Sequence, residues 1–150
     1  MTDDARDPKY FTLTEAERTR TEVEPLLIEA IELGRKIGHV DEQLQQAAQR
    51  IAMLGGALVT RGPLEKLRVE QDRLNEAIRG ALTRIEATGC VVKDLDVGLL
   101  DFPAVINDEE VYLCWRLGED RIRFYHRQDE GFDGRKPLDP RHPEPTPPVH

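Results

Sequence analysis

The sequence predicts an α+β fold, in which a long antiparallel helical hairpin, similar to a coiled coil, carries a small antiparallel β-meander as a cap. Between Val23 and Leu54, apolar residues recur in alternating steps of three and four, which is the period of a coiled-coil helix. A second stretch with this period runs from Leu64 to Ile85. After Gly89 the apolar residues alternate with polar ones, and this pattern is typical of strands.

The chain is long enough for one domain, or for a helical part with a small cap. We divide its 150 residues into three parts. Residues 10–88 form the predicted helical hairpin, and residues 89–138 form the predicted strand-rich cap. Residues 139–150 are rich in proline and poor in apolar side chains, so we expect a disordered tail there.

A short N-terminal helix is predicted to open the chain. Thr12 and Glu15 are three residues apart, as in a capping box. Thr14 and Glu17 offer the same chemistry two residues later. Pro25 then either kinks a continuous helix or lies in the first turn of a new one, because proline has no amide hydrogen to donate.

The long helix is predicted to continue to about Leu54, and the second helix to run from Pro63 to about Thr88. Gly38, within the first of these, is either a tolerated glycine or a point of close approach for a neighbouring helix. Gln71 interrupts the apolar period of the second helix. It either fixes the register of a coiled coil or reaches out to water.

The predicted cap contains four strands, and the second should end at Pro103, because proline cannot donate to a ladder. A two-residue loop at positions 119–120 joins the last two strands in this prediction. Alternation then puts His126 on the apolar face and Arg116 opposite Arg123 on the other face. The expected strands are Cys90–Lys93, Gly98–Pro103, Glu110–Leu117 and Arg121–His126, and the expected pairs on the apolar face are Leu117–Ile122, Trp115–Phe124 and Leu113–His126.

Polar side chains of the cap are the candidates for a site. A histidine such as His126 on an apolar strand face acts as a base or a metal ligand, or else it is a core-edge histidine bonded to backbone. Arg116 and Arg123 need negative partners if they face each other, and these are either carboxylates of the chain or an anionic ligand. The candidate ligand-binding residues are Asp101, Trp115, Arg116, Arg123, His126 and Arg135.

Metal and nucleophile chemistry have weaker support in the sequence. Asp94, Asp96 and Asp101 are either solvated carboxylates or partners of the arginines. Asp94 and Asp96 are also weak candidates for binding a hard cation. Apart from the metal-ligand interpretation of His126, no other metal ligand and no cofactor are predicted. Cys90 and Cys114 lack metal or redox spacing, and we expect both thiols to be reduced. The chain contains no serine, which excludes a serine nucleophile.

Charge and hydropathy limit the possible partners. The net charge is -8, and neither the helical part nor the rest is basic, so we do not expect nucleic acid as a partner. No apolar run reaches transmembrane length, and the N-terminus lacks the apolar core of a signal peptide. We therefore expect a soluble, cytoplasmic protein that does not bind membranes.

Four segments of the chain carry a resemblance to a known family. They are Tyr10–Leu13, Val92–Pro103, Leu113–Glu119 and Gly131–Leu138. In combination they resemble the prokaryotic family known as domain of unknown function 2203, over roughly residues 10–138. The resemblance implies a helical N-terminal part and a small strand-rich C-terminal part, and it implies no activity.

Two hypotheses of function follow. The first is a non-enzymatic bacterial protein-interaction or oligomerisation module, whose helices form a homodimer or bind another protein. The second is a small enzyme, or a ligand- or metal-binding domain, with its site on the cap. The long apolar stretches favour the first hypothesis, and the sequence leaves open whether the protein is an enzyme. Because the cap can cover only one end of the hairpin, a partner copy is expected near Ile51 and Leu67.

Overall fold

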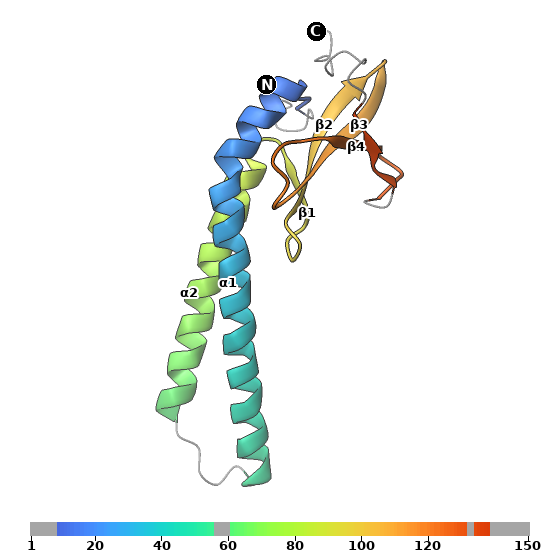
Figure 1. The fold of residues 1–150 in the computed structure, drawn as a ribbon. Coiled ribbons are helices and arrows are strands. Elements are labelled where there is room, and N and C mark those ends of the chain that lie inside the picture. The colour runs from blue at the N-terminus through green and yellow to red at the C-terminus, as the bar shows by residue number, and fades with distance from the viewer. Residues whose placement is uncertain (1–8, 56–60, 132–133, 139–150) are drawn as a thin grey trace, which may run out of the picture.

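The computed structural model describes residues 9–55, 61–131 and 134–138, and within these ranges it contains two helices and one antiparallel sheet. Helix α1 (Leu13–Met53) and helix α2 (Arg61–Glu86) lie side by side and run in opposite directions (Figure 1). The sheet has five strands in the order β1 to β5. The α+β class is therefore confirmed, and the predicted tail at 139–150 lies outside the described residues. The strands are β1 (Val91–Asp94), β2 (Leu99–Ile106), β3 (Glu109–Arg116), β4 (Phe124–Arg127) and β5 (Lys136–Pro137).

Helix α1 begins with the predicted capping box. The Thr12 side chain accepts a hydrogen bond from the Glu15 amide at 3.1 Å, and the Glu15 carboxylate accepts one from the Thr12 amide at 2.9 Å. The prediction of a separate short N-terminal helix was wrong, because α1 continues through Pro25. Val23 and Leu27, on either side of this proline, are both fully buried. Their packing offsets the cost of a proline inside a helix, which is about 3 kcal/mol for the missing hydrogen bond and the ring clash together.

Contacts between α1 and α2 show the roles of Gln71 and Gly38, for which the sequence left two alternatives each. The Gln71 amide of α2 donates a hydrogen bond to the Asp41 carboxylate of α1 at 2.7 Å, so this side chain reaches the neighbouring helix. A Cβ added at Gly38 would meet nothing within 4 Å. Gly38 is therefore a tolerated glycine, with no closely approaching helix beside it.

Strand β2 runs through Pro103 to Ile106, so the prediction that this proline ends the strand was wrong. The ladder between β1 and β2 extends only to the pair Val91–Asp101. Pro103 therefore has no β1 partner that would need its missing amide. Its carbonyl accepts a hydrogen bond from the Phe11 amide at 2.8 Å, and this bond fixes the segment before α1 to the sheet.

The predicted register between β3 and β4 was wrong by one residue. The connection is an irregular loop at 117–123, and the Ile122 amide donates to the Glu17 carboxylate of α1 at 2.6 Å. A one-residue shift moves every side chain of a strand to the opposite face. His126 therefore lies opposite Tyr112 and on the other face from Trp115, and the ladder does not place Arg116 and Arg123 opposite each other. The observed pairs are Val111–Arg127, Tyr112–His126, Leu113–Tyr125 and Cys114–Phe124.

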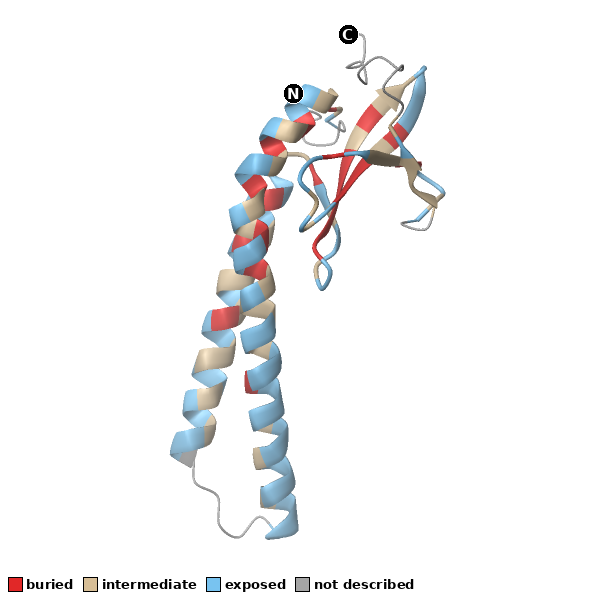
Figure 2. Cartoon of the chain, viewed as in Figure 1, coloured by how far each residue is buried: buried red, intermediate tan, exposed pale blue. Residues whose placement is uncertain are grey.

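The core lies where one sheet face meets the N-terminal half of α1 and the C-terminal end of α2. At its centre the rings of Phe11 and Phe102 pack edge to face, with 5.3 Å between their centroids. Figure 2 shows that buried residues gather at this end and become sparse along the projecting helices. The core residues are Phe11, Ala16, Val23, Leu27, Ile85, Cys90, Leu100, Phe102, Ala104, Val111, Leu113, Trp115 and Ile122.

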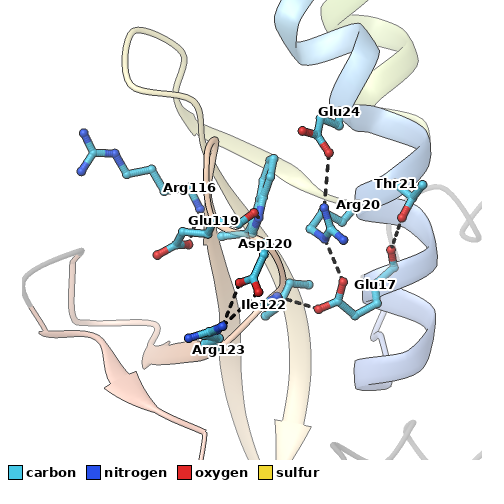
Figure 3. A network of polar contacts seen from close by, with 10 residues as sticks. Glu17, Arg20, Thr21, Glu24, Arg116, Glu119, Asp120, Ile122 and Arg123 are labelled. Carbon is cyan, nitrogen blue, oxygen red and sulfur yellow. Dashed lines mark hydrogen bonds and ion pairs between the residues drawn. The ribbon is translucent and has the colours of Figure 1, made fainter.

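A polar junction joins α1 to the loop after β3 (Figure 3). Glu17 accepts the hydrogen bond from Ile122 and also pairs with Arg20, whose Nε lies 2.8 Å from the carboxylate. Arg20 bonds to Glu24 as well, at 3.3 Å. Its guanidinium lies 5.5 Å from the centre of the Trp115 ring. The junction thus fixes the position of the sheet on the helix.

Candidate functional site

The face of the sheet that points away from the core carries a cluster of three polar side chains from adjacent strands. Leu100 and Phe102 face the core, so Asp101 between them faces the other way. Asp101 of β2 is paired with Cys114 of β3. His126 of β4 shares their face, and all three side chains are buried, with at most 2 % of their surface exposed. We call these three residues the Asp–Cys–His cluster.

Hydrogen bonds define the protonation pattern of His126. Its Nδ1 lies 2.8 Å from the Arg127 carbonyl oxygen. A carbonyl can only accept, so Nδ1 carries the hydrogen. Nε2 lies 3.1 Å from both carboxyl oxygens of Asp101. One proton shared between this nitrogen and the carboxyl group satisfies both and leaves the buried pair without net charge.

Burial dominates the acid–base behaviour of the cluster. Desolvation raises the pKa of Asp101 above its ordinary value, and the neighbouring His126 opposes that rise. Burial, together with the negative charge of Asp101, raises the pKa of Cys114 to about 12. Cys114 is therefore a thiol at neutral pH, and thiols are poor nucleophiles. In nucleophilic pairs of this kind the base lies next to the thiol, whereas here the imidazole Nε2 faces a carboxylate.

Of the other predicted site residues, Trp115 does not join the cluster, whereas Arg135 lies close enough for its charge to lower the pKa of Cys114 against the effect of burial. Trp115 lies on the core face, and its indole nitrogen donates to the Glu119 carbonyl oxygen at 3.0 Å. Arg135 forms an ion pair with Glu119 at 2.7 Å. Its guanidinium lies 4.0 Å from the ring centre of Phe124, whose position in β4 is opposite Cys114.

The partner of Arg123 differs from those predicted. Arg123 pairs with Asp120 at 3.0 Å, and the backbone amide of exposed Arg116 donates to the Glu119 carboxylate at 2.8 Å. For Arg123, a carboxylate of the loop at 117–123 therefore takes the role that was predicted for those of neighbouring strands, whereas the bond at Arg116 involves only its backbone. Asp101 instead faces His126.

Asp94 and Asp96, the weak metal candidates, form a local turn. The Asp94 carboxylate accepts a hydrogen bond from the Asp96 amide at 3.0 Å, as in an Asx-turn, and both residues are exposed. Asp96 also lines an open cavity of about 290 Å³ between α1 and the turn after β1, together with Ile31, Gly34, Arg35 and Leu95. None of the three cluster residues lines this cavity.

The comparison with known protein families shows to which family the chain belongs. The profile of the uncharacterized conserved proteins called DUF2203 matches residues 9–138, which is most of the chain. The chain belongs to DUF2203. The match spans both helices and the sheet of this DUF2203 chain, including the cluster. Searches of curated proteins and of solved structures found no match. In the described part of the chain, neither helix is apolar enough over a sufficient length to cross a membrane.

Sequence reasoning missed Cys114, although a signal for its position exists in this DUF2203 chain. The cluster forms because of the strand register, and the spacing between the two cysteines in the sequence gives no information about that register. Asn107 and Asp108 form a two-residue turn with φ of 53° and 65°, as a hairpin turn of type I′ requires. This turn alone sets the pairing of Asp101 with Cys114. The position of His126 could not be obtained in this way, because the loop after β3 is irregular.

Proposed function

We propose that this protein is a cytoplasmic, non-enzymatic interaction module of bacteria that forms a homodimer through a coiled-coil hairpin made of α1 and α2. The observation that carries the proposal is the change in burial along the helices. Val40 is the last buried residue of α1. None of residues 41–53 or 62–73 is buried, and we call these two ranges the distal half of the helix pair.

The distal half retains the apolar period but lacks a complete core. Its inward positions, which continue the 3.5-residue repeat, are only half-buried. Two helices alone cover one stripe each, whereas four helices enclose such positions fully. Complete burial of a Leu or Ile is worth about 1.5–3 kcal/mol, so a further layer would stabilise the distal half. These positions are Leu44, Ala47, Ile51, Leu64 and Leu67.

A second copy of the chain is the partner that fits this surface best. The sheet covers only the opposite end of the helix pair (Figure 1), so a partner can approach the distal half freely. Both helices carry acidic and basic residues there, for example Asp41 and Arg50 on α1 and Glu65 and Lys66 on α2. A surface of mixed charge does not repel an identical surface, and a two-fold interface uses the same patch twice.

Light scattering during size-exclusion chromatography tests the homodimer. We expect twice the monomer mass of 17.1 kDa at micromolar concentration. We also expect a melting temperature that rises with protein concentration, because association stabilises the folded chain by mass action. A mass of 17.1 kDa that does not change with concentration would refute the homodimer.

A matched pair of variants locates the interface. Leu67→Glu places a charge on the inward side of the distal half and should reduce the mass to that of a monomer. Val69→Glu is the control, since Val69 is 62 % exposed and lies about 200° around the helix from Leu67. Val69→Glu should remain dimeric. Equal effects of the two substitutions would place the interface elsewhere.

A further inference from the structure

We propose that Asp101, Cys114 and His126 form a binding site for a divalent transition metal ion of the Zn²⁺ type. This inference is independent of the proposed dimer. Each of the three side chains offers one potential ligand atom, and these three atoms all lie within 4.8 Å of one another. Among the residues that the structure describes, this is the one such group whose members are all buried.

The donor set selects the class of metal. The cluster offers one imidazole nitrogen, one sulfur and one carboxylate oxygen. Such a mixture suits Zn²⁺ and related first-row ions, whereas Mg²⁺ and Ca²⁺ prefer oxygen ligands alone. Three protein ligands leave one tetrahedral position for water or another small ligand, as in catalytic zinc sites.

The existing distances are close to those of a metal site. Nε2 of His126 lies 3.1 Å from each carboxyl oxygen of Asp101. A tetrahedral ion about 2.0 Å from both nitrogen and oxygen would hold those atoms about 3.3 Å apart. For the nitrogen and the oxygen, binding therefore needs only small side-chain movements. The Cys114 sulfur lies within 4.8 Å of both atoms, and a metal-bound thiolate would lie about 3.5 Å from each.

The surroundings of His126 are those of a metal ligand. Nδ1 is committed to the Arg127 carbonyl oxygen, so the lone pair of the imidazole belongs to Nε2, which faces the cluster. Metal-bound histidines commonly make this kind of second hydrogen bond, which fixes the tautomer and orients the ring. The bond to Arg127 thus prepares Nε2 for coordination.

Charge balance is maintained when the ion binds. A dication joined to one carboxylate and one thiolate is neutral as a group, as is the metal-free cluster with its shared proton and its thiol. Coordination replaces the proton between His126 and Asp101 and the proton on Cys114, and both leave to solvent. The buried site therefore gains no net charge, which would be costly at this depth.

Cobalt titration of the full chain tests the proposal, with Co²⁺ as a spectroscopic substitute for Zn²⁺. The wild-type protein should bind one Co²⁺ and develop the ultraviolet thiolate-to-cobalt charge-transfer band. Cys114→Ser should lose this band and weaken binding by more than about 100-fold, since even loss of an outer hydrogen-bond partner costs 10- to 100-fold. Cys90→Ser is the matched control. Cys90 is also buried, but its sulfur lies 3.7 Å from the Ile85 carbonyl oxygen, and this variant should keep the band.

Two outcomes would overturn the site: a wild-type protein without the band at equimolar Co²⁺, or a band that survives in Cys114→Ser. A variant that fails to fold does not remove the test, because X-ray absorption of the Co²⁺-loaded wild-type protein reports the ligands directly. One sulfur with nitrogen and oxygen neighbours supports the site, and a shell without sulfur overturns it.

Discussion

Glu17 offers the sharpest test of how the sheet is attached to the helix. Its carboxylate accepts the Ile122 amide at 2.6 Å and pairs with Arg20 at 2.8 Å. Replacement by alanine leaves a part-buried amide without this acceptor. Hydrogen bonds to charged groups contribute about 1.5–3 kcal/mol, and a partly exposed ion pair adds less than about 1 kcal/mol. We therefore expect Glu17→Ala to lower the free energy of unfolding by about 2–3 kcal/mol.

Thermal and urea unfolding followed by circular dichroism measure this loss. At roughly 3–4 °C per kcal/mol for a fold of this size, the melting temperature should fall by about 6–12 °C at fixed protein concentration. Glu17→Gln keeps an oxygen acceptor and should lose about half as much. Glu22→Ala is the matched control, because Glu22 is exposed on the same helix. If Glu17→Ala and Glu22→Ala have the same melting temperature, the junction does not hold the sheet as described.

Three further predictions concern the backbone, the cluster and the tail. Gly98→Ala should destabilise the fold, because Gly98 has φ of +71° and an added Cβ would lie 2.7 Å from that of Leu117. Gly80→Ala, on an open helix surface, should instead stabilise the fold by about 1 kcal/mol. Equal melting temperatures for the two variants would contradict this prediction. Burial raises the pKa of Asp101, so its stabilising contribution is complete below about pH 3.9 and is lost as pH rises through the folded pKa. With a chelator present, wild-type stability should therefore fall relative to Asp101→Asn from acid to neutral pH, and a constant difference would refute the assignment. A chain ending at Leu138, which packs on the core, should keep its melting temperature, and a loss of many degrees would show that residues 139–150 contribute.

Features fixed by neighbours in the sequence could be predicted. The capping box of Thr12 and Glu15 depends on a spacing of three residues, and the helix ends depend on local turn residues such as Gly89, whose φ is +102°. The 3.5-residue period included Val23, Ala30 and Val40 of α1 and Leu74, Ala81 and Ile85 of α2, which are buried, but it gave Leu26 in place of the fully buried Leu27. These signals act over a few residues, so one sequence contains all the information needed to read them.

Features fixed by distant contacts could not be predicted. The Ile122 amide bonds to Glu17, 105 residues away, and this bond ties the loop after β3 to α1 in place of the predicted two-residue hairpin turn. The error of one residue in register then placed His126 on the wrong face and separated it from Asp101. Helix α1 likewise continues through Pro25 because core packing outweighs a local preference for a break.

The attachment of the chain start to β2 has a consequence for synthesis on the ribosome. Phe11 bonds to Pro103 and packs on Phe102, so its partners are made about ninety residues later. At 5–20 residues per second this corresponds to a delay of about 5–20 s. During that interval Phe11 and the inward side of α1 lack the strands on which they pack in the folded protein. The nascent chain therefore presents an unfinished apolar helix to chaperones until the second strand emerges.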